Sequence, residues 1–97
     1  MKSALRVALI ILLLVLEARS DELPERVSLT AVISNPEKYE GKKIAVTGWL
    51  HLEFEGNALY IHREDYVHSL SGNGIWVDAA PEHGPLSDSY VIAYGTF

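Results

Sequence analysis

The sequence predicts a small, mainly β domain that folds as a barrel behind one short helix. Three observations indicate this class. Apolar and polar residues alternate along residues 42–54, with Gly48 at the centre, where a strand of a small barrel would bend. A two-residue turn follows at 56–57, and two further alternating segments span residues 74–79 and 90–97. We therefore expect four strands joined by tight turns and polar loops.

The first twenty residues have the composition of a secretory signal peptide. Two basic residues, Lys2 and Arg6, precede an apolar run over residues 7–16, and small residues end the segment. The run is shorter than the about 20 residues that a transmembrane helix needs. We therefore predict that residues 1–20 are removed on export to the periplasm or the extracellular space. The mature product would be one domain over residues 21–97, with no stable membrane anchor.

The predicted mature chain is strongly acidic. Residues 1–20 hold three of the eight basic residues and one of the thirteen acidic ones. Residues 21–97 therefore keep five and twelve, a formal charge of −7 against −5 for the whole chain. Phosphate backbones and anionic lipid repel such a chain, so nucleic acid is a disfavoured partner. The sequence has no cysteine, which excludes disulfides, thiolate nucleophiles and cysteine-based metal sites.

A short helix is expected before the first strand. Ser28 can cap it, Val27 lies where a hydrophobic staple would pack, and apolar residues recur at helical spacing over residues 29–33. Pro36 ends this helix, because the residue before a proline is disfavoured in a helical conformation. Residues 35–41 are then expected to form a turn.

The hairpin that follows has a predicted register. If the turn contains only two residues, apolar residues oppose each other on the inner face, and polar or aromatic residues do so on the outer face. A slip of one residue would invert one strand, so this match supports the register. The predicted opposed pairs are Phe54–Leu59 and Leu52–Ile61 inward, and Glu53–Tyr60 and His51–His62 outward.

The remaining connections are predicted to be polar. Residues 63–73 include one helical turn near residues 65–70, and residues 81–87 form a loop marked by two prolines and a glycine. A last strand is expected over Tyr90 to Phe97, and the pattern leaves open whether its outer edge is paired. An unpaired edge strand is a site for strand addition or self-association.

The order of turn and strand residues resembles a known family. A predicted helix is followed by Asn35-Pro36, Tyr39, Gly41-Lys42, Val46 and Gly48, and then by the hairpin. This pattern resembles small exported bacterial OB-fold proteins, a family similar to the tRNA-anticodon-binding OB-fold, over about residues 29–97. The resemblance implies a five-stranded, partly open Greek-key barrel. The family name describes a shape and does not by itself imply that this chain binds tRNA. Since only four strands are visible, the domain is truncated at its C-terminus, completed by a partner's strand, or contains a strand that the pattern does not reveal.

Side chains able to bind a ligand gather on the predicted outer face of the first three strands. They are Trp49, His51, Glu53, Tyr60, His62 and Trp76. In OB-folds this face commonly binds ligands, and its aromatic rings can stack on a sugar, a base or a peptide side chain. The alternative is an ordinary half-solvated sheet face on which aromatic residues pack across strands. The first interpretation predicts a non-enzymatic binding module whose partner is a protein or a small molecule.

His51 and His62 also define a candidate zinc site. Directly opposed Cβ atoms in a sheet lie about 5 Å apart, so two imidazoles could bind one Zn²⁺, with Glu53 nearby. This interpretation predicts a metal-binding protein or a metal-dependent enzyme that uses both histidines. The alternative is a surface histidine pair that binds nothing, in which case no cofactor is expected. The sequence has no glycine-rich phosphate loop, nucleophile elbow or His-Glu-x-x-His motif, so no catalytic residue is predicted.

Overall fold

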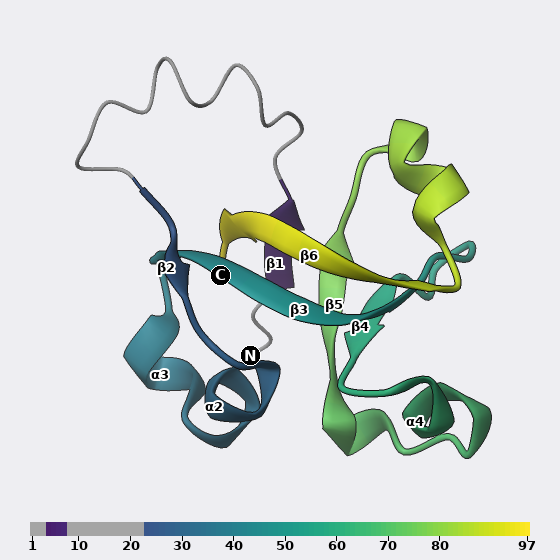
Figure 1. Cartoon of the computed structure of the whole chain (residues 1–97), viewed down its shortest axis with the longest axis horizontal. Coiled ribbons are helices and arrows are strands. Elements are labelled where there is room, and N and C mark those ends of the chain that lie inside the picture. Colours follow the sequence, from purple (N-terminus) through teal and green to yellow (C-terminus); the bar gives the residue numbers. More distant parts are fainter. Residues whose placement is uncertain (1–3, 8–22) are drawn as a thin grey trace.

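The computed structural model describes residues 4–7 and 23–97, which form short helices and a six-stranded sheet (Figure 1). The rest of the predicted signal peptide, residues 1–3 and 8–20, lies outside the described residues. The strands are β1 (Ala4–Val7), β2 (Glu25–Arg26), β3 (Lys43–His51), β4 (Ala58–Tyr60), β5 (Gly74–Asp78) and β6 (Ser89–Thr96). The helices are α2 (Leu29–Ser34), α3 (Pro36–Tyr39) and α4 (Arg63–Val67), with 3₁₀ turns η1 (Ser71–Asn73) and η2 (Pro81–Leu86).

The structure is a small mixture of helices and strands, which confirms the predicted mainly β class in part, with a helix near the start of the predicted domain. Its longest ladder joins β3 and β6, which pair antiparallel from Lys43 opposite Thr96 to Leu50 opposite Ser89. β4 pairs antiparallel with both β3 and β5. β1 pairs parallel with β5 and antiparallel with β6, while β2 adds to the free side of β3. The pairings therefore run from β3 through β4, β5, β1 and β6, and return to β3.

Two of these strands were not expected from the sequence. β1 lies in the predicted leader. β2 has only two residues, and directly after it Val27 N donates a further hydrogen bond to Ala45 O of β3. The strands predicted at residues 42–54, 74–79 and 90–97 are found as β3, β5 and β6, and the returning strand of the hairpin is found as β4. The bounds differ, most of all at the end of β3, which stops at His51. The strand count of four was therefore too low.

The N-terminal helix begins as predicted. Ser28 caps α2, its hydroxyl accepting a hydrogen bond of 3.0 Å from Ala31 N. α2 ends before Asn35, but Pro36 then begins α3, where its missing N–H costs nothing. The expected turn is thus mostly a helical turn that buries Tyr39, followed by Gly41 at a φ of 81°.

The predicted hairpin register is wrong by four residues. His51 lies opposite Ala58 rather than His62, and Leu50 lies opposite Leu59. The shift is even, so each side chain keeps its predicted face within β3 and β4. Phe54, which was expected to point inward, is 90 % exposed.

The register differs because β3 ends at His51 instead of continuing to Phe54. Leu52 N donates to Ser87 Oγ at 2.9 Å, and Glu53 N donates to Asn57 Oδ1 at 3.0 Å. These side-chain acceptors replace the strand partners that a two-residue turn would have supplied. Residues 52–57 are therefore a wider loop, with Glu55 at a φ of 58°.

Gly48 allows β4 to approach β3 closely. A Cβ atom at this position would lie 2.7 Å from Tyr60 O and 2.8 Å from Leu59 Cγ. The sequence predicted a bend at this glycine, whereas the contacts show a steric requirement for a residue without a side chain. The core beneath it consists of Leu5, Leu29, Val32, Tyr39, Ile44, Val46, Leu50, Leu59, Val77, Ala93 and Phe97.

Candidate functional site: the outer face around His51

The observed register places most of the predicted ligand-binding residues on one face. Trp49 lies opposite Tyr60 on β4, while His51 lies opposite Ala58, which in turn lies opposite Trp76 on β5. Because side chains two residues apart share a face, these positions form two adjacent rows across the sheet. The sequence therefore identified Trp49, His51, Tyr60 and Trp76 as residues of one face despite the wrong register.

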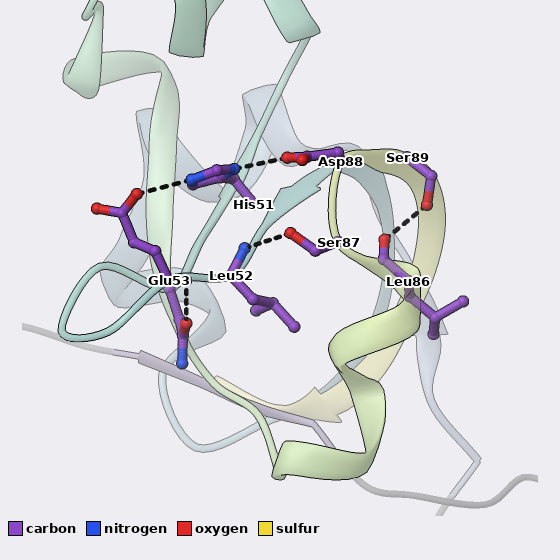
Figure 2. Close-up of polar contacts among 8 residues, drawn as sticks. His51, Leu52, Glu53, Leu86, Ser87, Asp88 and Ser89 are labelled. Atoms are coloured by element: carbon purple, nitrogen blue, oxygen red, sulfur yellow. Dashed lines mark hydrogen bonds and ion pairs between the residues drawn. The ribbon is translucent and has the colours of Figure 1, made fainter.

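His51 is held between two carboxylates. Its Nδ1 lies 2.6 Å from Asp88 Oδ1, and its Nε2 lies 2.7 Å from Glu53 Oε1. Figure 2 shows the ring between the two acidic side chains, Glu53 from the loop after β3 and Asp88 from the segment before β6. An imidazolium can donate to both at once, and hydrogen bonds between ions are stronger than neutral ones. Glu53, predicted as a ligand-binding residue, is therefore a partner of His51.

The pKa of His51 is raised above its ordinary value of 6.5. Burial of the ring, which leaves its side chain 14 % exposed, opposes protonation. Burial is the largest single cause, but the hydrogen bonds to Asp88 and Glu53 and the negative charges of both groups together outweigh it. The arrangement thus favours the protonated form of His51 more than water favours that of a free imidazole.

Asp88 reaches His51 because of an unusual backbone conformation. Its φ is 67°, in the left-handed region that aspartate tolerates better than most residues. Its N–H donates to Leu50 O at 2.6 Å, which ties this segment to the end of β3. The neighbouring Ser87 hydroxyl accepts from Leu52 N, and Ser89 donates to Leu86 O (Figure 2). Several local bonds therefore fix the carboxylate in position.

Tyr66 completes an aromatic cluster over the outer face. Its ring stacks on His51 with centroids 4.1 Å apart, and lies 5.5 Å from Trp49 and 5.8 Å from Tyr60. The Trp49 and His51 rings are 6.1 Å apart and nearly parallel. This cover explains why Trp49 is only 5 % exposed although it points away from the core. Burial also raises the pKa of the Tyr60 hydroxyl.

His62 lies outside this cluster. It precedes α4 as the capping residue, and its backbone N–H donates to Asp65 Oδ2 at 2.8 Å. Asp65 is buried and also accepts from Asn73 Nδ2 at 2.9 Å; this bond is the largest cause of the lowered pKa of Asp65. The opposed His51–His62 pair on which the zinc hypothesis depended is therefore not formed. Residues 4–7 and 23–97 contain no group of three or more His, Cys, Asp or Glu side chains placed to hold a metal ion.

Two exposed aromatic residues flank the cluster. Trp76 on β5 is 52 % exposed, and Tyr90 on β6, opposite Trp49, is 56 % exposed. The Tyr90 hydroxyl accepts a hydrogen bond from Arg63 N at 3.2 Å, so its ring reaches toward α4. The accessible part of this face therefore has an aromatic side chain on each side of the clamped histidine.

The sequence interpretation missed Tyr66, Asp88 and Tyr90 as residues of the site. Tyr66 belongs to a segment expected to be a polar connection, and Asp88 follows a segment expected to be a loop. The alternation of side chains along β6 would have placed Tyr90 on this face if the pairing of β6 with β3 had been known, since Tyr90 lies opposite Trp49. No local signal indicated that Asp88 would meet His51.

Comparisons with protein-family models, curated proteins and solved structures found no match to this chain. None of the helices within the described ranges has the length and apolar character needed to cross a bilayer.

Proposed function

We propose that this protein is an exported, OB-fold-like binding module that recognises an uncharged or basic ligand on the outer face of β3, β4 and β5. The exposed rings of Trp76 and Tyr90, on either side of the cluster around His51, are the observation that carries this proposal. Exposed aromatic side chains on a rigid sheet can stack on a ligand at little entropic cost. Between these two rings, Tyr66 covers His51 and forms part of the same surface.

The strand pairing supports an OB-fold-like architecture. Five strands, β3, β4, β5, β1 and β6, pair in succession and return to the first. An OB-fold is a five-stranded, partly open barrel whose second and third strands contribute to a ligand-binding face. Among the strands of this ring that belong to the predicted domain, β3, β4, β5 and β6, the second and third along the chain are β4 and β5.

Charge supports an uncharged or basic ligand. Glu53 and Asp88 are more than half exposed beside one partly buried histidine, so even a fully protonated His51 leaves the group with an excess negative charge. The whole chain has a formal charge of −5. An anionic ligand would meet this negative field, whereas a Lys or Arg side chain could pair with the carboxylates and pack on an aromatic ring.

The engagement of both ring nitrogens argues for a positioning role of His51. A general base needs a ring nitrogen within reach of the proton that it removes. Here each nitrogen faces a carboxylate oxygen within 2.7 Å. His51 therefore serves to join the loop after β3 to the segment before β6.

A binding experiment with matched peptides tests the proposal. The ¹⁵N-labelled full chain is titrated with capped Lys-Trp-Lys and with capped Glu-Trp-Glu, and two-dimensional NMR spectra are recorded. We expect specific shifts of the Trp76 indole and of residues around Tyr90 with the basic peptide, and at least a ~10-fold weaker response to the acidic one. Trp76→Ala should abolish the response, whereas Leu23→Ala, at an exposed apolar residue outside the sheet, should preserve it.

Equal responses to the two peptides would contradict the charge argument, and shifts away from this face would contradict the site. A titration with Zn²⁺ provides an independent arm, because shifts confined to His51 and His62 would favour the metal hypothesis instead. Absence of any response to Trp-containing peptides in both charge states would reject peptide-like ligands for this face.

A further inference from the structure

One strand of the sheet comes from the segment that the sequence predicts to be removed. β1 lies between β5 and β6 (Figure 1). Its residues pair parallel with β5, Leu5 opposite Val77, and antiparallel with β6, Val7 opposite Gly95. β1 therefore connects two strands that are not otherwise paired with each other within the described residues.

The strand is held by its side chain as well as by its backbone. Leu5 is fully buried and belongs to the same core cluster as Val77, Ala93 and Phe97. Val77 N donates to Asn57 O on the β4 side. Since successive N–H groups of a strand point to opposite sides, the amides of Trp76 and Asp78 point toward β1.

Removal of residues 1–20 would open this position. The backbone edges at Trp76–Asp78 and at Gly95–Thr96 would lose their partner, and the core would lose Leu5. A sheet edge with unpaired backbone groups readily takes up another strand, and a side-chain pocket beside it adds specificity. The position left by β1 would have both unpaired backbone groups and a pocket, the one that Leu5 fills.

We propose that, in the processed protein, the place between β5 and β6 accepts an extended segment of another protein that carries an apolar residue at the Leu5 position and a basic residue next to it. The apolar requirement follows from the full burial of Leu5. The basic requirement follows from the register, which sets Arg6 opposite the exposed, acidic Asp78. The site is a sheet edge and is independent of the outer aromatic face.

An exchange experiment tests this proposal on a chain that has already folded. A specific protease site is inserted after Ser20, the full chain is folded and then cleaved, and the free leader is competed away with a fluorescent peptide of residues 2–9. Binding is followed by fluorescence anisotropy, and hydrogen exchange of the Trp76 and Asp78 amides is followed by NMR. We expect the peptide to bind and to restore slow exchange at both amides.

Matched peptides define the chemistry of the occupant. A peptide with Leu5→Asp should bind at least ~30-fold weaker, because a buried apolar side chain is replaced by a charge. A peptide with Arg6→Glu should bind ~3- to 10-fold weaker, with the difference shrinking as salt is added. The uncleaved chain should bind none of them, since its own β1 fills the place.

The outcomes are decisive in both directions. Equal binding of the Leu5→Asp peptide, or unchanged amide exchange when the leader departs, would overturn the proposal. A cleaved chain that unfolds on release of the leader but is rescued by the peptide supports it, whereas unfolding that the peptide does not prevent overturns it. Dimerisation of the cleaved chain at the expense of peptide binding, measured by sedimentation, would assign the place to a second copy and overturn the proposal.

As a second variant, full-length Leu5→Asp should lose slow exchange at Trp76 and Asp78 and gain peptide binding.

Discussion

The inner and outer faces of β3 and β4 are made by alternate residues of the same strands, yet they are stabilised in different ways. On the inner face Val46, Leu50 and Leu59 belong to the apolar core cluster. On the outer face Trp49 and His51 are covered by Tyr66 and linked to two carboxylates. Apolar burial varies little with pH, whereas the outer cluster depends on the charge of one imidazole.

The two faces differ in which parts of the chain supply the side chains that pack on them. The inner face is filled largely by neighbouring strands, so a local alternation pattern is enough to specify it. The outer face depends on Tyr66 from α4 and Asp88 from the segment before β6, which lie 15 and 37 residues beyond His51 in the chain. The stability of the inner face and the organisation of the outer face should therefore respond to different substitutions.

The largest expected effect is a cavity on the inner face. Leu59 is fully buried, so Leu59→Ala should reduce the free energy of unfolding by about 2–5 kcal/mol, from lost burial and an unfilled cavity. Urea denaturation of the full chain measures this change. Leu86→Ala is the matched control, since Leu86 is 47 % exposed and its truncation should alter stability by less than about 0.5 kcal/mol. Similar losses for both variants would mean that Leu59 does not occupy the core.

A smaller loss is expected when a methyl group is added between the strands. Gly48→Ala would place a Cβ 2.7 Å from a backbone oxygen of β4, and backbone cannot move aside as a flexible side chain can. We expect a loss of about 1–3 kcal/mol from overpacking, again measured by urea denaturation. Gly72→Ala tests the steric argument, because a Cβ there would meet nothing within 4 Å. If both alanines cost the same, the close approach of β4 is not the reason for Gly48.

The sequence predicted the faces of β3 and β4 better than their length. Apolar residues continue to alternate through Leu52 and Phe54, so the pattern alone extends the strand. The strand ends earlier because Ser87, remote in sequence, accepts the Leu52 N–H. A local pattern cannot anticipate a competing acceptor from a distant loop, and the hairpin register was wrong for this reason.

Strand β1 and the distant residues of the site could not be predicted from the sequence for a related reason. The leader's apolar run has the composition of a signal sequence, which masks the tendency of Ala4–Val7 to act as a strand. Trp49, His51 and Tyr60 were correctly assigned to one face, because a register shift by an even number of residues leaves every side chain on the same face of the sheet. The clamp on His51 could not be predicted, because the left-handed conformation that aims Asp88 is set by tertiary contacts.

The smallest expected effect is a pH dependence that belongs to the outer face alone. The pKa of His51 is higher in the folded chain than its ordinary value of 6.5, so its charge stabilises the fold fully below about pH 6.5. This stabilisation is lost as the pH rises through the folded pKa. Asp88→Asn keeps an acceptor but removes a charge, so it should lower the midpoint of the His51 ring titration measured by NMR. The change in stability at acidic pH should be less than about 1 kcal/mol, because both carboxylates are well exposed.

Two further measurements separate this effect from other charges. Asp65 titrates in the opposite sense, since its lowered pKa gives a contribution that is lost only as the pH falls below its ordinary range near 3.8. Glu82→Gln, which removes an exposed carboxylate from η2, should leave the His51 titration unchanged. An unchanged midpoint in Asp88→Asn would show that Glu53 alone holds the charge on His51, and Glu53→Gln would then produce the whole decrease. A normal His51 midpoint in the unmodified chain would remove the electrostatic difference between the two faces.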